Sequence, residues 1–441
     1  MRYLSLCVIA FYCTLRLYSQ APTIEWQKSL GGYDTDEPSS IQQTNDGGYI
    51  ITGYVSSFDG DVTGNHGGND YWVVKIDSTG LIQWQKSFGG TDDDEAASIQ
   101  QTNDQGYVVA GFSRSDNGDV TENFGESDYW LVKMDSTGEI QWEKSYGGSG
   151  NDYASSIQQT NDKGFIVAGA SFSADGDVVG NQGSCDYWIL KLDSSGNIQW
   201  QKSLGGSGSD YAYSVQQTTD NGFIIGGAST SSNGDVTGNQ GSYDYWVVKV
   251  DEQGDIQWEK SIGGGGLEKA YSIKQTSEGG YVTVGEKSSD IFVVKLDDAG
   301  SIQWQDSFGG SDWDWGYDIQ QTQDGGYVVA GMSSSTDGDL TNNYGYDDFW
   351  IFKLNSSGNM QWQKSYGGSY YDMAKSIQVT DDGGFIVAGS SGSCDFDVSG
   401  HHGCISCKDF WVVKLSASNN IFEPFMLNCV MTYPNPVKNQ L

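Results

Sequence analysis

A repeated segment with an Ile-Gln-Trp core, or a close variant of it, dominates this sequence. Its copies begin at residues 24, 82, 140, 198, 256, 302 and 360, so they lie 58 residues apart five times and 46 residues apart once. A fixed period of this length indicates one structural unit that is repeated, with a hydrophobic core shared between neighbouring units. We therefore expect residues 22–426 to fold as one domain.

Each repeat contains four short segments with the composition of β-strands. In the third unit these are residues 154–160, 164–169, 187–192 and 198–204, separated by tight-turn signals and by one polar loop over residues 170–186. Four short antiparallel strands in a unit of 46 to 58 residues are typical of a β-propeller blade. The sequence thus predicts an all-β fold, a seven-bladed β-propeller of four-stranded antiparallel blades.

The phase of the repeat predicts how such a ring closes. Residues 24–30 correspond to the fourth strand of a blade, yet no first three strands precede them. The last blade has the opposite lack, because Pro424 interrupts the segment in register for its fourth strand. We expect the N-terminal strand 24–30 to pair with residues 411–415 and close the ring.

The two ends of the chain indicate export. Residues 1–21 combine a basic start with a short apolar run, which predicts a secretory signal peptide; a retained membrane anchor is the alternative. After cleavage of this segment we expect no membrane insertion. Residues 427–441 are interpreted as a linker and the start of a further, truncated domain.

Two stretches resemble known families. The run Gly205-Gly-Ser-Gly-Ser-Asp-Tyr-Ala-Tyr-Ser-Val215, followed by Asn221-Gly-Phe-Ile-Ile-Gly-Gly227, resembles the seven-bladed β-propeller repeat family of bacterial secreted proteins. The tail Met431-Thr-Tyr-Pro-Asn-Pro436 resembles the opening of the C-terminal sorting domain of type IX secretion substrates. The resemblance implies a secreted, extracellular or cell-surface protein, and no single chemistry.

Charge restricts the class of partner. The chain has 58 acidic and 23 basic residues, a formal charge of −35, which repels nucleic-acid phosphates and anionic lipids. We therefore expect no nucleic-acid partner. The remaining partners are an extracellular protein or a glycan, bound by a monomer.

A first set of candidate site residues is an acid that recurs before the first strand of every blade. Antiparallel order places these acids on the face that also carries the long polar loops. They could ring the channel mouth and bind a cation or an amine, or they could accept backbone N–H bonds within their own loops. The set comprises Asp36, Asp94, Asp152, Asp210, Glu268, Asp314 and Asp372. A second recurring acid precedes each third strand and is expected to fix the neighbouring loop.

The long loop between the second and third strands offers oxygen side chains at alternate positions, the ligand spacing of calcium loops. Plain Asx-turn structure is the alternative, because the bidentate Glu of an EF-hand is absent. The candidate calcium ligands are Asp59, Asp61, Thr63, Asn65, Asp175, Asp177, Asn181, Asp337 and Asp339. The 46-residue unit lacks the loop, so a blade does not need it.

Three cysteines gather in the last blade, at Cys394, Cys404 and Cys407. Export favours a disulfide among them over a zinc site with His401 and His402. We expect Cys394 to pair with Cys404 or Cys407.

These patterns favour a secreted or surface-displayed propeller that serves in binding, adhesion or scaffolding, with calcium as a candidate stabilising ion. The alternative is a carbohydrate-active enzyme that uses carboxylates on the long-loop face. Near-identical blades argue for the non-enzymatic function, because an active site normally breaks repeat symmetry. The repeating aromatic positions are interpreted as core between blades rather than as a sugar-stacking platform.

Overall fold

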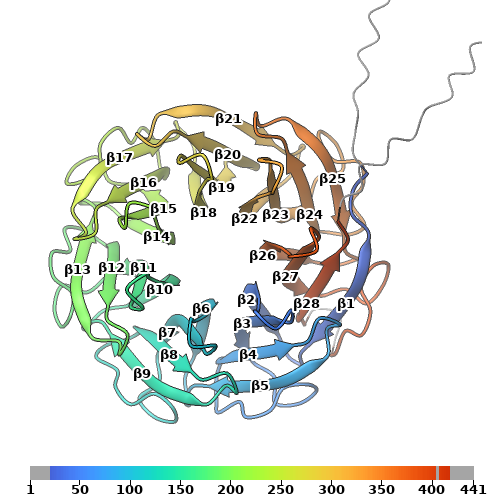
Figure 1. Ribbon diagram of the computed structural model, residues 1–441, viewed down its shortest axis with the longest axis horizontal. Coiled ribbons are helices and arrows are strands. Elements are labelled where there is room, and N and C mark those ends of the chain that lie inside the picture. The colour runs from blue at the N-terminus through green and yellow to red at the C-terminus, as the bar shows by residue number, and fades with distance from the viewer. Residues whose placement is uncertain (1–19, 404–406, 418–441) are drawn as a thin grey trace, which may run out of the picture.

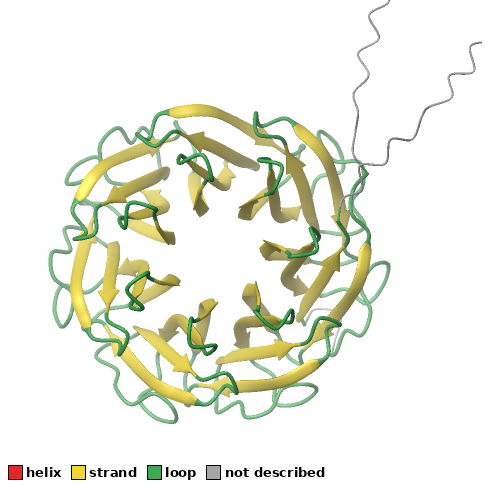
Figure 2. Cartoon of the chain, in the orientation of Figure 1, coloured by secondary structure: helices red, strands yellow, loops and turns green. Residues whose placement is uncertain are grey.

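The computed structural model describes residues 20–403 and 407–417. In this part of the chain, strands β1 to β28 form seven four-stranded antiparallel sheets, arranged as the blades of a ring (Figure 1). The rest of the described chain is turns and loops, and no helix long and apolar enough to span a membrane occurs in it (Figure 2). The predicted all-β, seven-bladed propeller is confirmed. The tail at 427–441, Cys404 and all of the predicted signal peptide except residues 20 and 21 lie outside the described residues.

The first strand of each blade lines the channel, and the second strand follows it through a tight turn. The innermost strands are β2 (Asp36–Gln43), β6 (Asp94–Gln101), β10 (Asp152–Gln159), β14 (Asp210–Gln217), β18 (Glu268–Gln275), β22 (Asp314–Gln321) and β26 (Asp372–Val379). The second strands are β3 (Tyr49–Val55), β7 (Tyr107–Ser113), β11 (Phe165–Ser171), β15 (Phe223–Ser229), β19 (Tyr281–Lys287), β23 (Tyr327–Ser333) and β27 (Phe385–Ser391).

The third and fourth strands complete each blade outward. The third strands are β4 (Asp70–Ile76), β8 (Asp128–Met134), β12 (Asp186–Leu192), β16 (Asp244–Val250), β20 (Asp290–Leu296), β24 (Asp348–Leu354) and β28 (Asp409–Leu415). The outermost strands are β5 (Ile82–Phe88), β9 (Ile140–Tyr146), β13 (Ile198–Leu204), β17 (Ile256–Ile262), β21 (Ile302–Phe308), β25 (Met360–Tyr366) and β1 (Ile24–Leu30).

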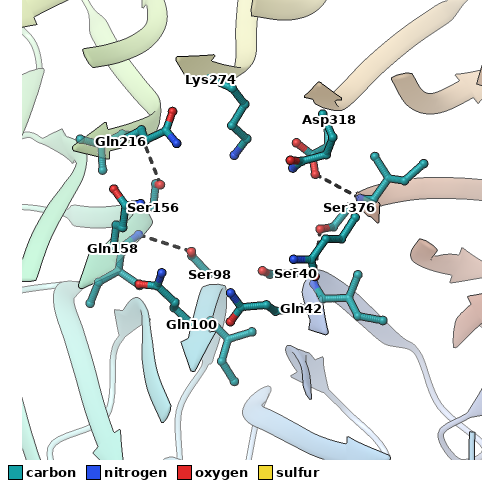
Figure 3. Close-up of a pocket in the computed structure, with 17 residues that line it drawn as sticks. Ser40, Gln42, Ser98, Gln100, Ser156, Gln158, Gln216, Lys274, Asp318 and Ser376 are labelled. Atoms are coloured by element: carbon teal, nitrogen blue, oxygen red, sulfur yellow. Dashed lines mark hydrogen bonds between the residues drawn. The ribbon is translucent and has the colours of Figure 1, made fainter. Parts of the chain in front are cut away.

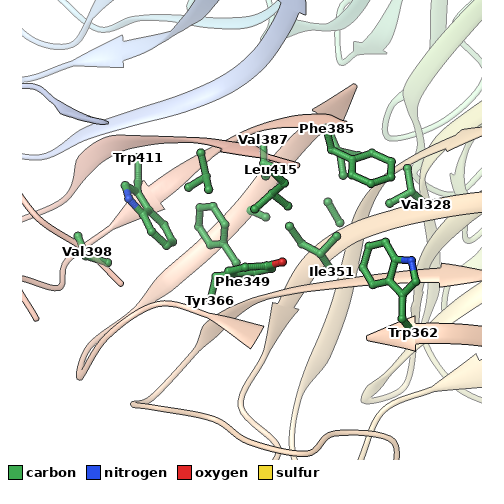
Figure 4. Close-up of a cluster of buried hydrophobic side chains, with 14 residues drawn as sticks. Val328, Phe349, Ile351, Trp362, Tyr366, Phe385, Val387, Val398, Trp411 and Leu415 are labelled. Carbon is green, nitrogen blue, oxygen red and sulfur yellow. The ribbon is translucent and has the colours of Figure 1, made fainter. Parts of the chain in front are cut away.

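The hydrophobic core lies between adjacent blades. Third strands are buried on both faces, as their unbroken apolar runs indicate, because each blade packs face to face on the next. Between the sixth and seventh blades, the rings of Phe349 and Trp411 lie 4.5 Å apart in one such cluster (Figure 4). A hydrogen bond joins blades as well, since the hydroxyl of Tyr187 donates to the carbonyl of Trp246 at 2.8 Å.

The N-terminal strand closes the ring. Strand β1 pairs antiparallel with β28, and Gln27 faces Val413 while Ser29 faces Trp411. The seventh blade is therefore built from both ends of the described chain, β26, β27 and β28 together with β1 (Figure 1). This confirms the closure that the repeat phase predicts.

Candidate functional site

The seven acids expected at the channel mouth are buried in the loops of their own blades. Each is at most 1% exposed and begins an innermost strand. The Oδ2 atom of Asp36 accepts the N–H of Gly32 and the hydroxyl of Ser57, both at 2.8 Å. The corresponding two bonds form at Asp94, Asp152, Asp210, Asp314 and Asp372, and Glu268 accepts the N–H of Gly264. Each acid thus ties together the two loops on this face of its blade. These contacts correspond to the structural role, in which the acid accepts hydrogen bonds within its own loops.

The second recurring acid lies beside the first. At Gly205, an added Cβ would lie 2.6 Å from Asp186 Oδ1 and 2.4 Å from Asp210 Oδ2, so both carboxylates crowd this glycine. Asp186 Oδ2 accepts the N–H of Gln182 at 2.7 Å, whereas its Oδ1 has no hydrogen-bond partner among the described residues. Burial raises the pKa of Asp186 to about 7, and the charge of Asp210 adds to the shift. The unpartnered Oδ1 recurs at Asp70, Asp128, Asp244, Asp348 and Asp409.

The oxygen side chains proposed as calcium ligands are engaged within the loops. The Oδ1 atom of Asp59 accepts the N–H of Tyr33 at 2.8 Å, and Asn65 Nδ2 donates to the carbonyls of Val55 and Ser57. Thr63 bonds Gln85. The other candidate ligands make similar contacts. Asp61, Asp177 and Asp339 each accept a backbone N–H from a glycine that precedes an innermost strand. Asp175 and Asp337 each accept the backbone N–H of a serine, and Asn181 Nδ2 donates to the carbonyls of Ser171 and Ser173. Within the described residues, no three His, Cys, Asp or Glu side chains gather as a metal site would require.

The backbone conformation requires the glycine of the repeated Asp-Gly-Asp motif. Gly176 has a φ of 64°, and a Cβ there would lie 2.4 Å from the carbonyl oxygen of Gly147. The loop can dock against its neighbour only with glycine at this point. Loop docking therefore accounts for the glycine of the Asp-Gly-Asp motif.

The structure places Cys394 as an exposed free thiol. The preferred pairing of Cys394 with Cys404 or Cys407 is thus not the arrangement found. Since Cys404 lies outside the described residues, a bond between Cys404 and Cys407 stays a prediction.

The blades differ at a bulge position that faces the channel. Each innermost strand has a β-bulge, so one residue has no partner in the pairing; in β14, Ala212 faces Gly227 and Ser214 faces Gly226, which leaves Tyr213 between them. Bulges re-aim side chains and occur often beside binding sites. In blade order the bulge residues are Ser39, Ala97, Ser155, Tyr213, Tyr271, Tyr317 and Lys375. Three adjacent blades thus carry tyrosine, the next carries lysine, and the others carry small residues.

A cavity of about 290 Å³ opens among these bulge residues at the long-loop end of the channel. We call it the mouth cavity; it is lined by all the bulge residues except Ala97, together with Glu37, Pro38 and Tyr54. The ring of Tyr271 lies 5.2 Å from that of Tyr213 and 5.4 Å from that of Tyr317, so the three form a continuous arc. The cavity is therefore lined by an aromatic arc from three adjacent blades and by Ser155 from the blade next to it.

Hydrogen bonds hold the centre of the arc in place. The Tyr271 hydroxyl donates to Glu286 Oε1 at 3.0 Å, and Lys269 Nζ lies 3.5 Å from the same oxygen. Glu286 is 4% exposed, so it is a buried hydrogen-bond acceptor for the tyrosine. Burial raises the pKa of Tyr271 well above its ordinary value, and the hydroxyl stays protonated at any physiological pH.

The wall of the mouth cavity beside this arc is charged. Lys375 Nζ lies 3.8 Å from the centre of the Tyr317 ring, a cation–π contact. Glu37 Oε1 lies 2.9 Å from Lys408 Nζ, so this carboxylate is already paired with another cation. Burial lowers the pKa of Lys375 to about 8, although the charge of Glu37 opposes the shift.

Below the mouth cavity the channel narrows to rings of serine and glutamine around a second cavity of about 240 Å³ (Figure 3). The glutamines link the blades, since Gln42 Oε1 accepts the N–H of Gln101 at 2.6 Å. Lys274 and Asp318 replace a glutamine and a serine of these rings (Figure 3). Polar groups of the channel wall are thus largely used to hold neighbouring blades together.

Exposed aromatic side chains gather on the same face as the mouth cavity. In the described part of the chain, the aromatic side chains with the largest exposure all lie in or beside the loops of the long-loop face: Tyr33, Phe58, Phe124, Phe172, Trp313, Tyr344, Tyr346, Tyr371 and Phe396. Some of these pair, as Tyr346 and Tyr371 do with ring centres 4.9 Å apart. Strand tryptophans such as Trp72 and Trp188 lie between blades, as interpreted, but these loop aromatics do not.

The sequence interpretation missed the mouth cavity because it followed what the repeats share. The signal was present as a departure from the repeat, at the fourth residue of each innermost strand. That position reads Ser39 in the first blade, Tyr271 in the fifth and Lys375 in the seventh.

Comparison with known proteins shows similarity at the level of the fold. No protein-family model matches the chain, and no curated protein is significantly similar to it. Among solved structures, Sqt1 from Chaetomium thermophilum is 12% identical, with coverage of 90% of this chain and 100% of the other and a TM-score of 0.48. BamB from Moraxella catarrhalis is 14% identical, with 89% and 100% covered and a TM-score of 0.43. The Pan2 WD40 domain from Neurospora crassa is 10% identical, with 90% and 96% covered and a TM-score of 0.49.

Proposed function

We propose that this propeller is an extracellular binding protein that holds a glycan at the mouth cavity of its long-loop face. The observation that carries the proposal is the arc of Tyr213, Tyr271 and Tyr317. These rings stand where three other blades have small residues and one has lysine, and they line a cavity. Aromatic rings beside hydroxyl groups suit a sugar, whose C–H faces stack on rings while its hydroxyls form hydrogen bonds.

The exposed aromatic side chains of the loops support a ligand larger than the mouth cavity. Trp313 is 61% exposed and stacks on Trp315 with ring centres 5.6 Å apart, and Phe58 is 64% exposed on another blade. Large apolar groups in water are costly unless a partner covers them. A glycan chain that ends in the mouth cavity and continues across the face would cover exposed aromatic side chains of this kind.

A binding function fits the mouth cavity better than hydrolysis does. A glycosidase requires two carboxyl groups that flank the scissile bond. The lining of the mouth cavity includes a single carboxylate, Glu37, and that group is paired with Lys408. The acids considered for the enzymatic alternative, such as Asp36 and Asp210, bond their own loops instead.

We also propose that the protein reaches its ligand by secretion, on the basis of residues 1–21 and of the type IX resemblance at residues 431–436. Expression of the full chain in a host with type IX secretion should give extracellular or surface protein whose N-terminus begins near residue 22. Retention in the cytoplasm with Met1 still present would contradict this.

A glycan array tests the binding proposal. The wild-type protein should bind a defined set of extracellular glycans, and the double variant Tyr213→Ser, Tyr271→Ser should lose at least about tenfold in affinity. Serine is chosen because Ser39 and Ser155 hold the same bulge position in other blades, so the backbone accepts it. Leu81→Ala, an exposed side chain on the outer rim, is the matched control. Binding of proteins but of no glycan, or equal binding by the double variant, would contradict the proposal.

A further inference from the structure

The mouth cavity contains a lysine, Lys375, that forms no ion pair within the described residues. Lys375 occupies a bulge position that is small or aromatic in every other blade. Its ammonium group has three N–H donors. Among residues 20–403 and 407–417 its contact is with the ring of Tyr317 at 3.8 Å, without a hydrogen bond or an ion pair.

Glu37, the carboxylate in the lining of the mouth cavity, does not form an ion pair with Lys375. Glu37 Oε1 is bonded to Lys408 Nζ at 2.9 Å, on the side of the cavity formed by the neighbouring blade. The cluster of Lys375, Glu37 and Lys408 therefore has one more positive than negative charge. This is unusual in a chain with a formal charge of −35.

Burial makes this excess charge costly unless a ligand compensates it. Lys375 is partly buried, with the Tyr317 ring on one side and the cavity on the other. A buried ammonium without an anionic partner loses hydration and gains little in return. An anionic ligand in the mouth cavity would therefore be attracted by the charge of Lys375 and would accept hydrogen bonds from its unused N–H groups.

We propose that the glycan bound at the mouth cavity ends in a sugar that carries a single carboxylate, which Lys375 binds while the tyrosine arc stacks on the sugar ring. This inference rests on the proposed glycan-binding function and adds the chemical class of the terminal sugar. The acidic surface sets the limit of one charge, because a polyanionic chain across the long-loop face would be repelled. Ser155 lines the cavity on the blade next to that of Tyr213, so its hydroxyl is available to the sugar hydroxyls.

The test compares two disaccharides that differ in one group, a glucuronide-terminated disaccharide and the matching glucoside-terminated disaccharide, by calorimetric titration at pH 7. We expect the wild-type protein to prefer the glucuronide by about tenfold, the size of one charge-assisted hydrogen bond. Lys375→Met should remove this preference, so that the ratio of the two affinities falls to about one. Lys375→Arg should keep most of the preference, since arginine retains the charge.

Lys86→Met is the matched control, because it also removes one lysine charge but lies on the outer strand β5 beside Glu139. It should keep the full preference. Thermal melts of all variants establish that each is folded.

The outcomes separate this inference from the proposed function. Equal affinity of the wild-type protein for both disaccharides, or a preference for the glucuronide that survives Lys375→Met, overturns the inference and leaves glycan binding in place. Binding of neither disaccharide, together with an empty glycan array and binding of a peptide that ends in a free carboxylate, overturns both.

Discussion

Trp411 Nε1 donates a hydrogen bond of 2.8 Å to Gln27 Oε1, across the junction between the two ends of the propeller. The same bond occurs inside ordinary blades, from Trp72 to Gln85 and from Trp188 to Gln201. The closing strand β1 thus reproduces the contacts of a fourth strand of the same blade. Closure removes the exposed edge that β28 would otherwise present.

Removal of residues 22–31 should therefore open the ring. We expect the deleted protein to aggregate or to unfold without a cooperative transition, because the edge of β28 and the cluster around Phe410 become exposed. Size-exclusion chromatography and calorimetry measure both effects. Gln27→Leu is the control, since it should cost about 1 kcal/mol for one hydrogen bond and leave the protein a cooperative monomer. A monomeric deletion variant with the melting temperature of the intact chain would contradict the argument.

The paired carboxylates predict a pH dependence of stability. Burial raises the pKa values of Asp186 and Asp348 to about 7 and those of Asp36 and Asp128 to about 6, from an ordinary 3.8. Between about pH 4 and pH 7 the folded chain therefore binds more protons than the unfolded chain, so stability falls as the pH rises through this window. The melting temperature should be higher at pH 5 than at pH 8.

One substitution isolates this effect. Asp186→Asn keeps an acceptor for the N–H of Gln182 and places an amide beside Asp210. We expect it to raise the free energy of unfolding by about 1 kcal/mol at pH 8 and by little at pH 5. Glu122→Gln removes one charge from an exposed loop and should change neither value. A larger gain at pH 5 than at pH 8 would refute the assignment.

The long loops should not need calcium. Their oxygen side chains already accept or donate hydrogen bonds within the loops, as Asp59 does with Tyr33 and Asp175 with Ser149. We expect equal melting temperatures in a chelator and in millimolar-scale calcium. A calcium-dependent rise that Asp59→Ala with Asp61→Ala reduces would instead support the calcium sites, because a ligand of the folded state raises its stability.

The fold could be predicted from the sequence because each blade repeats the same physical requirements. The apolar run at residues 187–192 must be buried on both faces, which indicates stacked sheets. The chain begins with a fourth strand and the last blade lacks one, so the N-terminal strand completes the last blade. The pairing of residues 24–30 with the third strand of the last blade follows from phase alone.

The candidate site could not be predicted in the same way. The acid that recurs in every blade was considered either as a ligand or as an acceptor of bonds within its own loop. Asp152 accepts hydrogen bonds from Gly148 and Ser173, so it recurs because each blade has the same loop contacts. Tyr213 and Lys375 face the channel because of a bulge, which shifts pairing by one residue and leaves no mark in an apolar pattern. Only the backbone pairing shows that this position points at a cavity.

The lowered pKa of Lys375 predicts how binding of the acidic sugar depends on pH. The groups around Lys375 are Glu37, Lys408 and Tyr317; burial raises the pKa of Tyr317 well above its ordinary value, so its hydroxyl stays neutral. Lys375 loses its proton as the pH rises through about 8, whereas a sugar carboxylate stays ionised. The attraction is therefore present below pH 8 and lost above it, and the bound carboxylate shifts the midpoint upward.

Titrations from pH 6.5 to about pH 9.5 should show this directly. Affinity for the glucuronide-terminated disaccharide should fall by about tenfold over the range, while affinity for the glucoside stays constant. Lys375→Arg should remove the pH dependence without removing the preference, because a guanidinium remains charged throughout. A pH dependence that persists in Lys375→Arg would assign the titration to another group and contradict the role of Lys375.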